Sequence, residues 1–249
     1  MKKINLNPDT YISWDYLCPI INSTLNINYG SLGVNSRHRG LSVDGKLPHS
    51  ISEYEFNYMK DFIIKNNLTN GFDLSTGTGI SALGIGLGMK KTKGKLLSVD
   101  SYVEFENGDI IVLNSEEHDS FDSELYKNNK KLIELFNLQD NVELKVGVSP
   151  HDCINFLEGK QKLDFVFFDC PKSKEDFIRD ATYVKDNLNT DKFVIFWHDT
   201  HVFMEDFKKL SIDFFGIESK QLHNFKFGDN KIYQHFPLSM ITNIETETL

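Results

Sequence analysis

The sequence predicts an α/β protein with a doubly wound, mostly parallel sheet of seven strands and an antiparallel hairpin near its C-terminus. Two observations support this fold class. First, short apolar segments of strand length alternate with helical segments over most of the 249 residues, as in sheets that helices cover on both faces. Second, two apolar segments near the C-terminus flank Gly228-Asp229-Asn230, a sequence typical of a hairpin turn.

Each strand is predicted by its apolar composition and by the polar or glycine residues on either side. Residues 163–168 and 193–197 are almost wholly apolar, as expected for strands that are buried on both faces. Residues 101–122 are polar and acidic around one apolar stretch, so we expect an insertion there. The expected strands are 71–74, 95–100, 142–146, 163–168 and 193–197, followed by the hairpin strands 225–227 and 232–236.

Helices are expected between these strands because apolar residues recur there every three or four positions. The first helix begins at Ile51, and Ser52 and Glu55 have the spacing of a capping box at its start. Further helices are expected to begin near Ile80, Leu125, Ser149, Ser173 and Phe203.

Residues 1–50 precede the alternating pattern and lack sustained periodicity. Glycines at positions 30, 33, 40 and 45 interrupt this segment. An irregular segment of this kind can close over a bound substrate, so we expect an N-terminal extension or lid over residues 1–50. Residues 51–249 then form the ligand-binding domain.

Charge and composition exclude several classes of function. The 27 Lys and Arg residues against 36 Asp and Glu residues give a net charge of −9, which repels a nucleic acid backbone. The three cysteines are too widely spaced for a disulfide framework or a thiolate zinc site. No stretch approaches the length of about 18 apolar residues that a membrane span needs. We expect a cytoplasmic protein with no nucleic acid or membrane partner, and leave a homo-oligomer open.

Polar residues follow the first two predicted strands, where open parallel sheets bind their ligands. Gly77 and Gly79 follow strand 71–74, and Asp100 ends strand 95–100. The glycines allow a tight turn close to a ligand, the next helix offers free N–H groups, and a carboxylate can accept both hydroxyls of a ribose. These features predict a nucleoside-containing cofactor. Residues 77–82 also satisfy G-x-G-x-x-A, so a dinucleotide of the NAD type is one candidate.

Asp73 distinguishes between the candidate cofactors. This acid lies within the first strand, four positions before Gly77. A carboxylate there would repel a pyrophosphate, but it can help to hold a ligand with a positive charge at its amino-acid end. Asp73 therefore favours S-adenosylmethionine.

Residues 51–236 resemble the class I S-adenosylmethionine-dependent methyltransferases. Phe72 to Gly79 resembles their first motif, acid-x-G-x-G-x-G, with Ser75 in place of the first glycine. The resemblance implies a Rossmann-like methyltransferase fold, with residues 51–249 as an S-adenosylmethionine-binding methyltransferase domain. It implies cofactor contacts from Asp73, Ser75, Thr76, Gly77, Gly79, Asp100, Ser101, Val148, Ser149 and Asp169.

Two acids end neighbouring strands further along the chain. Asp169 follows strand 163–168, and Asp199 follows strand 193–197. Because adjacent parallel strands have their carboxyl ends on one edge of the sheet, we expect both carboxylates to face one cleft. Oxygen ligands suit Mg²⁺ or another hard divalent cation, which can lower the pKa of a substrate hydroxyl. Each acid could instead cap the helix that follows it.

The same positions resemble motifs of O-methyltransferases. Asp169-Cys170-Pro171-Lys172 resembles the D-x-x-K segment of cation-dependent catechol and caffeoyl-type enzymes, which implies Asp169 as a metal ligand and Lys172 as the general base. His198-Asp199-Thr200 resembles the strand end of sugar and antibiotic O-methyltransferases and of the cephalosporin-hydroxylase-like group, where an acidic pair binds Mg²⁺. The implied metal ligands are Asp169, His198 and Asp199, and the implied base is Lys172 or His198. Without the resemblance, Lys172 is equally a solvated lysine and His198 a structural histidine.

We therefore expect an S-adenosylmethionine-dependent enzyme that methylates a hydroxyl of a small molecule or a sugar. A divalent cation at the acidic edge is expected to serve catalysis and not cofactor binding. Two alternatives remain open: an NAD-type oxidoreductase that uses the same glycine turn, and a module that binds S-adenosylmethionine without turnover.

Overall fold

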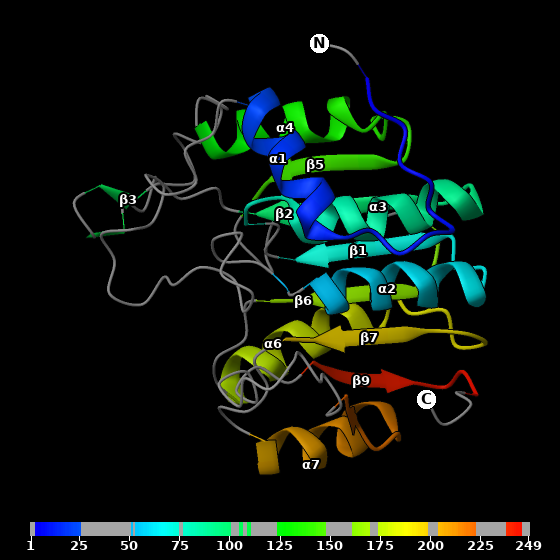
Figure 1. The fold of residues 1–249 in the computed structure, drawn as a ribbon. Coiled ribbons are helices and arrows are strands. Elements are labelled where there is room, and N and C mark those ends of the chain that lie inside the picture. The colour runs from blue at the N-terminus through cyan, green and yellow to red at the C-terminus, as the bar shows by residue number, and fades with distance from the viewer. Residues whose placement is uncertain are drawn as a thin grey trace, which may run out of the picture.

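A seven-stranded sheet runs through the molecule and carries helices on both of its faces (Figure 1). The computed structural model describes residues 3–25, 51, 53–74, 77–100, 105–106, 109–110, 124–147, 161–169, 174–198, 204–222 and 238–245. The strand order is β5-β2-β1-β6-β7-β9-β8. These strands are β1 (Asn70–Leu74), β2 (Lys95–Asp100), β5 (Val142–Val146), β6 (Phe165–Phe168), β7 (Val194–Trp197), β8 (Lys220–Gln221) and β9 (Ser239–Thr242).

Pairing within the sheet is parallel from β5 to β7 and antiparallel beyond it. β9 pairs with both β7 and β8 in the antiparallel sense. The predicted mostly parallel sheet with antiparallel pairing on its C-terminal side is therefore confirmed. The predicted hairpin strands 225–227 and 232–236 lie outside the described residues. In the described part of the sheet the antiparallel pairing comes instead from β9 with β7 and β8, and Met240 and Ile241 of β9 are buried in different cores.

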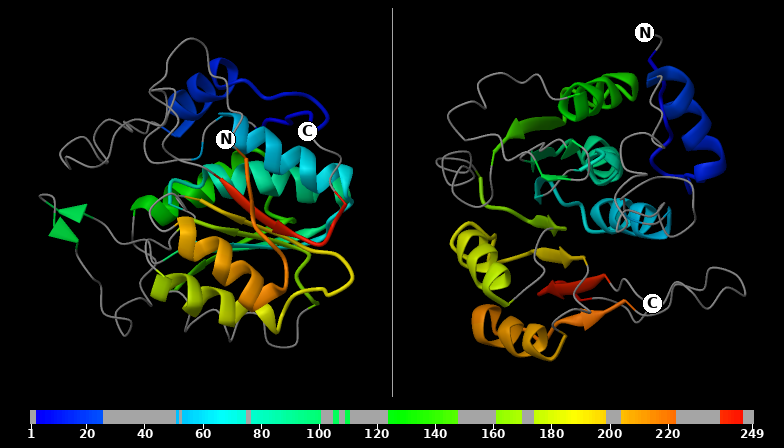
Figure 2. Two further views of the ribbon diagram at one scale, coloured as in Figure 1. Left: turned by 90° about the horizontal axis from the view of Figure 1, so that it is seen from below. Right: turned by 90° about the vertical axis from the view of Figure 1, so that its left-hand side faces the viewer.

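Two hydrophobic cores lie on opposite faces of the sheet (Figure 2). Neighbouring residues of one strand alternate between them: Phe167 and Phe196 belong to the first core, Phe168 and Trp197 to the second. Both faces are covered, which explains the continuous apolar composition of β6 and β7. The first core lies under α1 (Trp14–Leu25), α2 (Glu53–Lys65), α3 (Ile80–Thr92) and α4 (Glu124–Leu135), and the second under α6 (Lys174–Lys185) and α7 (Met204–Phe215).

The helix α1 lies in the segment that was expected to be an extension or lid. Trp14, Leu17 and Ile21 are buried in the first core, so this part of residues 1–50 belongs to the folded domain. Their spacing is that of one helical face, but Pro19 within the helix weakens the local signal. The rest of the expected lid, residues 26–50, lies outside the described residues.

Polar side chains of α2 hold the N-terminal segment against the domain. Asn57 donates to the carbonyl of Ile12 at 3.0 Å and accepts from its N–H at 2.9 Å. The fully buried Lys60 donates to the carbonyls of Pro8 and Thr10 at 2.8 and 2.7 Å. These contacts satisfy buried backbone groups that would otherwise cost free energy, and they fix the start of the chain on α2.

Two sequence-based expectations concern segments that the structure describes in part or not at all. The expected insertion at 101–122 contains two short strands, β3 (Phe105–Glu106) and β4 (Asp109–Ile110), which pair with each other and not with the main sheet. The helix expected from Ser149 lies outside the described residues. Within the described ranges, no helix has the length and apolar character needed to cross a membrane.

Candidate active site

The candidate site lies at the carboxyl ends of the parallel strands. Asp100 ends β2, and Asp169 and His198 directly follow β6 and β7. The described residues thus bring Asp73, Gly77, Gly79, Asp100, Asp169 and His198 from the predicted set to one region of the sheet. The remaining predicted site residues, Ser75, Thr76, Ser101, Val148, Ser149, Lys172 and Asp199, lie outside the described residues.

The two glycines after β1 form a turn that requires glycine. Gly77 has φ 51° and Gly79 has φ 84°, both in the left-handed region. A Cβ atom on Gly79 would lie 2.6 Å from Oδ1 of Asn129 and 3.2 Å from Leu132, both on α4. Asn129 also donates from Nδ2 to the carbonyl of Gly77 at 2.9 Å. The sequence pattern indicated Asn129 only as part of a helix, so its contact with the turn was missed.

Asp100 links the glycine turn to the neighbouring strand. Its Oδ2 accepts a hydrogen bond from the backbone N–H of Gly77 at 2.8 Å. The carboxyl group is half-buried at the end of β2. A carboxylate has acceptor positions for several donors, so this contact is compatible with hydrogen bonds to ribose hydroxyls.

Asp73 is fully buried between β1, β2 and the first turn of α3. Its Oδ2 accepts hydrogen bonds from Ser98 on β2 at 2.8 Å and from Ser81 on α3 at 3.1 Å. Its Oδ1 is buried without a hydrogen-bond partner among the described residues. Burial raises the pKa of Asp73 to about 7, against the two serine hydroxyls, which lower it. A buried carboxylate with one unpartnered oxygen is a suitable neighbour for a positively charged ligand.

His198 lies between two carboxylates. Its Nδ1 is 2.9 Å from Oδ1 of Asp169, and its Nε2 is 3.4 Å from Oε1 of Glu55 on α2. Burial lowers the pKa of His198, but the charges of Asp169 and Glu55 raise it further, so its pKa lies well above the ordinary value of 6.5. The two carboxylates therefore favour the protonated form of the imidazole, with a hydrogen bond between Nδ1 and Asp169 and a longer charge contact between Nε2 and Glu55.

The raised pKa of His198 works against metal ligation by its imidazole. A ligating imidazole needs an unprotonated nitrogen, but both ring nitrogens face carboxylates that attract an N–H. Among the residues that the structure describes, no three His, Cys, Asp or Glu side chains are grouped so as to hold a metal ion. The prediction that Asp169 and Asp199 share a cation stays a prediction, because Asp199 lies outside the described residues.

Glu55 is the site residue that sequence reasoning assigned to another role. The spacing from Ser52 predicted a capping box, but Ser52 lies outside the described residues, and the Glu55 carboxylate faces His198. Glu55 is 2% exposed, as buried as the apolar residues of α2. An acid four positions before the buried Met59, on the helix face that covers the sheet, was the signal that could have found it.

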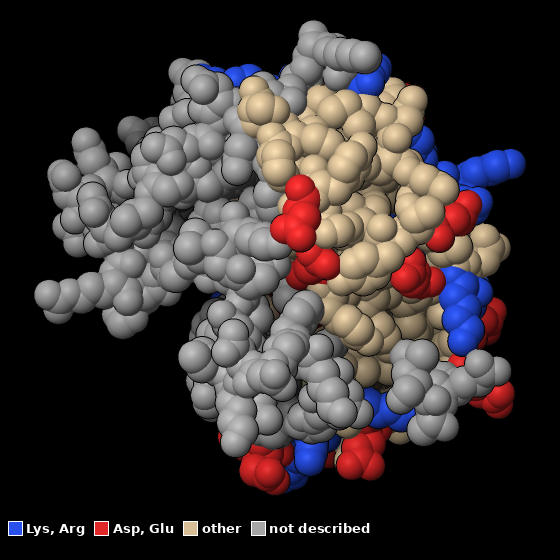
Figure 3. Space-filling model, viewed as in Figure 1, with Lys and Arg blue, Asp and Glu red and all other residues tan. Residues whose placement is uncertain are grey.

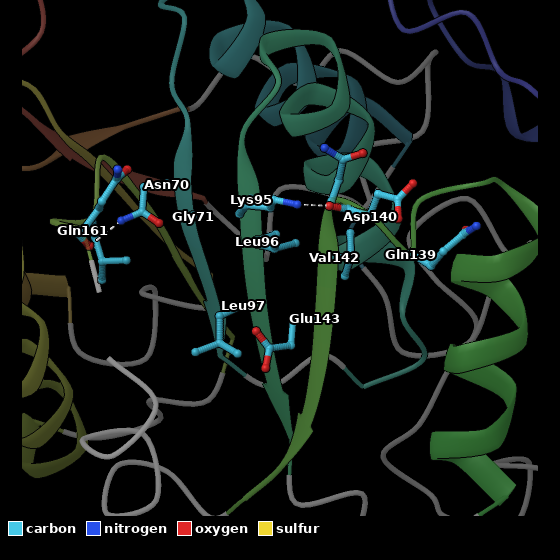
Figure 4. A pocket seen from close by; sticks show the side chains of 12 residues that line it. Asn70, Gly71, Lys95, Leu96, Leu97, Gln139, Asp140, Val142, Glu143 and Gln161 are labelled. Carbon is cyan, nitrogen blue, oxygen red and sulfur yellow. Dashed lines mark hydrogen bonds between the residues drawn. The ribbon is translucent and has the colours of Figure 1, made fainter. Parts of the chain in front are cut away.

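A pocket of about 770 Å³ lies at the opposite edge of the sheet (Figure 4). It is lined by residues at the amino ends of the strands, including Asn70 of β1, Lys95 of β2 and Val142 of β5. Ligands of open parallel sheets bind at the carboxyl ends, so this pocket is not the candidate cofactor site.

Comparison with known proteins identifies the family of this chain. The model of a family described as "Methyltransferase domain" matches residues 74–200, half of the chain, and the chain belongs to this family. It is a class I S-adenosylmethionine-dependent methyltransferase. This assignment replaces the NAD-type oxidoreductase alternative. No curated protein sequence matches the chain.

Solved structures share the fold at low sequence identity. An O-methyltransferase from Bacillus cereus in complex with S-adenosylhomocysteine has a TM-score of 0.62 at 13% identity, with 94% of this chain and 93% of that chain covered. An O-methyltransferase named TomG from Streptomyces achromogenes, in complex with S-adenosylmethionine and involved in tomaymycin synthesis, has a TM-score of 0.54 at 14% identity, with 77% and 81% covered. These likenesses support the Rossmann-like methyltransferase fold.

The glycine turn leads to a prediction with an internal control. Gly79→Ala should lower the free energy of unfolding by about 1–2 kcal/mol, because alanine is strained in the left-handed conformation. The collision of its Cβ atom with Asn129 should lower the free energy of unfolding further. Gly216→Ala is the matched control, because Gly216 has φ 67° but a Cβ atom there would meet nothing within 4 Å. Chemical denaturation should therefore show a larger loss for Gly79→Ala. Equal losses would contradict the close packing of the turn against α4.

Asp73 leads to a prediction about pH. A pKa raised from 3.8 to about 7 means that, between these pH values, the folded protein binds a proton that the unfolded chain releases. The free energy of unfolding therefore falls as the pH rises from 3.8 to about 7. The side chain of the Asp73→Asn variant cannot ionise. Without ligand, the free energy of unfolding of this variant should exceed that of the wild type by about 2–4 kcal/mol at pH 8, and the difference should shrink toward pH 4. Denaturation at both pH values measures this, with the exposed Asp191→Asn as control. A difference that does not change with pH would contradict the buried-carboxylate interpretation.

Proposed function

We propose that this methyltransferase transfers the methyl group of S-adenosylmethionine to a hydroxyl of a small molecule or a sugar. The observation that carries the proposal is the pairing of His198 with Asp169 at the ends of β7 and β6, on the strand edge that also bears the glycine turn. The B. cereus and S. achromogenes structures of the same fold are both named O-methyltransferases, which supports the choice of oxygen as acceptor.

The cofactor would lie along the glycine turn. The backbone of Gly77 is partly exposed beside the cofactor, and the buried Gly79 shapes the turn. Asp100 would accept from the ribose hydroxyls, and Asp73 would provide negative charge near the methionine end. Ser75, Thr76, Ser101, Val148, Ser149 and Asp169 are the further contacts that the resemblance implies. When bound, S-adenosylmethionine supplies an electrophilic methyl group on a positively charged sulfur. The acids gathered on this edge favour a ligand with that charge.

The acceptor hydroxyl must lose its proton as its oxygen attacks the methyl carbon and the carbon–sulfur bond breaks. Because carboxylates at both ring nitrogens favour the protonated form of His198, Lys172, the other base that the resemblance implies, is the base in this proposal. In that form His198 would contribute a positive charge at the strand edge, which would stabilise negative charge that develops on the acceptor oxygen. The proposal includes no metal ion, because the same two carboxylates work against metal ligation by His198.

The proposed acceptor class agrees with the surface. The face shown in Figure 3 carries no large patch of Lys and Arg among its described residues, and the sequence has a net charge of −9. An anionic polymer such as a nucleic acid would be repelled by this charge. A small hydroxyl compound does not depend on such a patch.

Cofactor binding can be measured by calorimetry. S-adenosylmethionine and S-adenosylhomocysteine should bind, whereas NADH should not. Asp100→Ala should weaken binding about 10- to 100-fold, because it removes charge-assisted hydrogen bonds worth about 1.5–3 kcal/mol. The exposed Asp186→Ala serves as control, with thermal unfolding measured in parallel. Tight NADH binding without an S-adenosylmethionine signal would overturn the proposal.

Methyl transfer can be measured with labelled S-adenosylmethionine and a panel of catechol, a hydroxycinnamate and a simple sugar. We expect transfer to oxygen that continues in excess EDTA, because both ring nitrogens of His198 face carboxylates that favour an N–H over a metal ion. Activity that EDTA abolishes and Mg²⁺ restores would instead support the sequence-based prediction of a cation between Asp169 and Asp199. Binding without transfer to any hydroxyl compound would favour a module without turnover.

A further inference from the structure

Three ionisable side chains from three separate elements meet at the strand edge. Glu55 comes from α2, Asp169 follows β6 and His198 follows β7, with His198 in the centre of the cluster. The exposed fractions of their side chains are 3%, 26% and 11%. The Glu55–His198 distance of 3.4 Å is that of an ion pair and exceeds that of a strong hydrogen bond.

Glu55 occupies a position that packing alone would give to an apolar residue. Phe56, Met59, Phe62 and Ile63 of the same helix are all buried in the first core. Burying a carboxylate costs free energy, and a buried ion pair is often no more stable than apolar residues of similar volume. The stability of α2 therefore does not explain why an acid lies here.

Aromatic packing holds α2 in register with the strand that ends at His198. The rings of Tyr58 and Phe62 lie edge-on to Phe196 of β7, with centroid distances of 5.9 and 5.5 Å. Glu53 of the same helix is directed elsewhere, since its carboxylate accepts a hydrogen bond from the backbone N–H of Trp14 at 2.7 Å. The aromatic contacts with Phe196 thus give the Glu55 carboxylate a defined position relative to the imidazole.

The two acids restrict the imidazole in complementary ways. Asp169 contacts Nδ1, and Glu55 faces the opposite nitrogen, Nε2. Both nitrogens lie off the Cβ–Cγ axis, so each contact resists rotation of the ring about that bond, and loss of the Glu55 contact would leave only the one at Nδ1. The backbone N–H of His198 adds a third restraint through its bond to the carbonyl of Phe168 at 2.9 Å.

We propose that Glu55 is a positioning residue of the methyl-transfer site, which acts by holding Nε2 of His198 so that the ring stays aligned with Asp169 at the reacting edge. This inference rests on the proposed function, since it assigns His198 a place in the reaction. It adds α2 to the elements that build the site. Glu55 acts through His198 and has no contact with the reacting atoms of its own.

A double-mutant cycle tests the proposal. Glu55→Gln, His198→Gln and the double variant are compared for kcat and KM with S-adenosylmethionine and the panel compound that the wild type methylates. Each single variant should lower kcat about 10- to 100-fold, and the double variant should be no slower than His198→Gln alone. The affinity for S-adenosylhomocysteine should change less than threefold. Losses in kcat that multiply in the double variant would overturn the proposal.

A spectroscopic measurement separates positioning from a merely structural effect. In the ¹⁵N-histidine NMR spectrum of the complex with S-adenosylhomocysteine, the Nε2 signal of His198 should shift in Glu55→Gln. Glu53→Gln, on the same helix but directed at Trp14, should leave this signal and kcat unchanged. Glu55→Asp keeps the charge with a shorter reach and should retain an intermediate kcat, which provides a second variant if Glu55→Gln folds poorly.

The outcomes distinguish the proposal from the function on which it rests. A wild-type protein that binds no S-adenosylmethionine or methylates no hydroxyl compound would overturn the proposed function. Methyl transfer with an unshifted Nε2 signal in Glu55→Gln, or equal effects of Glu53→Gln and Glu55→Gln, would overturn the role of Glu55 alone.

Discussion

The candidate site depends on the register of four parallel strands. Leu74 pairs with Val99 and with Phe168, and Phe168 pairs with Trp197. The residues that follow these positions must therefore reach the same edge together. The backbone continues this order one residue further, since the N–H of Asp169 donates to Leu74 at 3.2 Å and that of His198 donates to Phe168 at 2.9 Å. This backbone register places Asp169 and His198 next to each other and Asp100 at the same edge, on the far side of β1.

Gathering acids on one edge has an electrostatic consequence. Burial raises the pKa of Asp73 most, and the charges of Asp100 and Asp169 raise it further, while Asp169 and Glu55 raise the pKa of His198 against the lowering effect of its burial. The same repulsion that destabilises the carboxylates makes the edge attractive to a cation, whether the imidazolium of His198 or the sulfonium of a cofactor. The local charge thus fits a methyltransferase better than an enzyme that binds a pyrophosphate.

The proposed function divides the site into a cofactor half and an acceptor half, and different helices support the residues assigned to each. The cofactor half is supported by α3 and α4, through Ser81 on Asp73 and Asn129 on the glycine turn. The acceptor half is supported by α2, through Glu55 on His198. Because α2 also holds the N-terminal segment through Asn57 and Lys60, the start of the chain is mechanically connected to the reacting edge.

The sequence by itself determined the fold class and the edge at which the site lies. Apolar strands alternating with helices identify a parallel sheet, and a residue that ends such a strand can lie only at the carboxyl edge, so the positions of Asp100, Asp169 and His198 followed from local pattern. Side chains that face across elements were decided by the tertiary structure alone. Glu55 and His198 are far apart in the sequence. Helical periodicity predicts which face of α2 is buried, but it does not predict which strand end that face contacts. The contact of Asn129 with the glycine turn and the packing of α1 in the first core could not be predicted for the same reason. Helix packing against the sheet depends on the shapes of both surfaces, and the spacing of residues along one segment gives no information about the other surface.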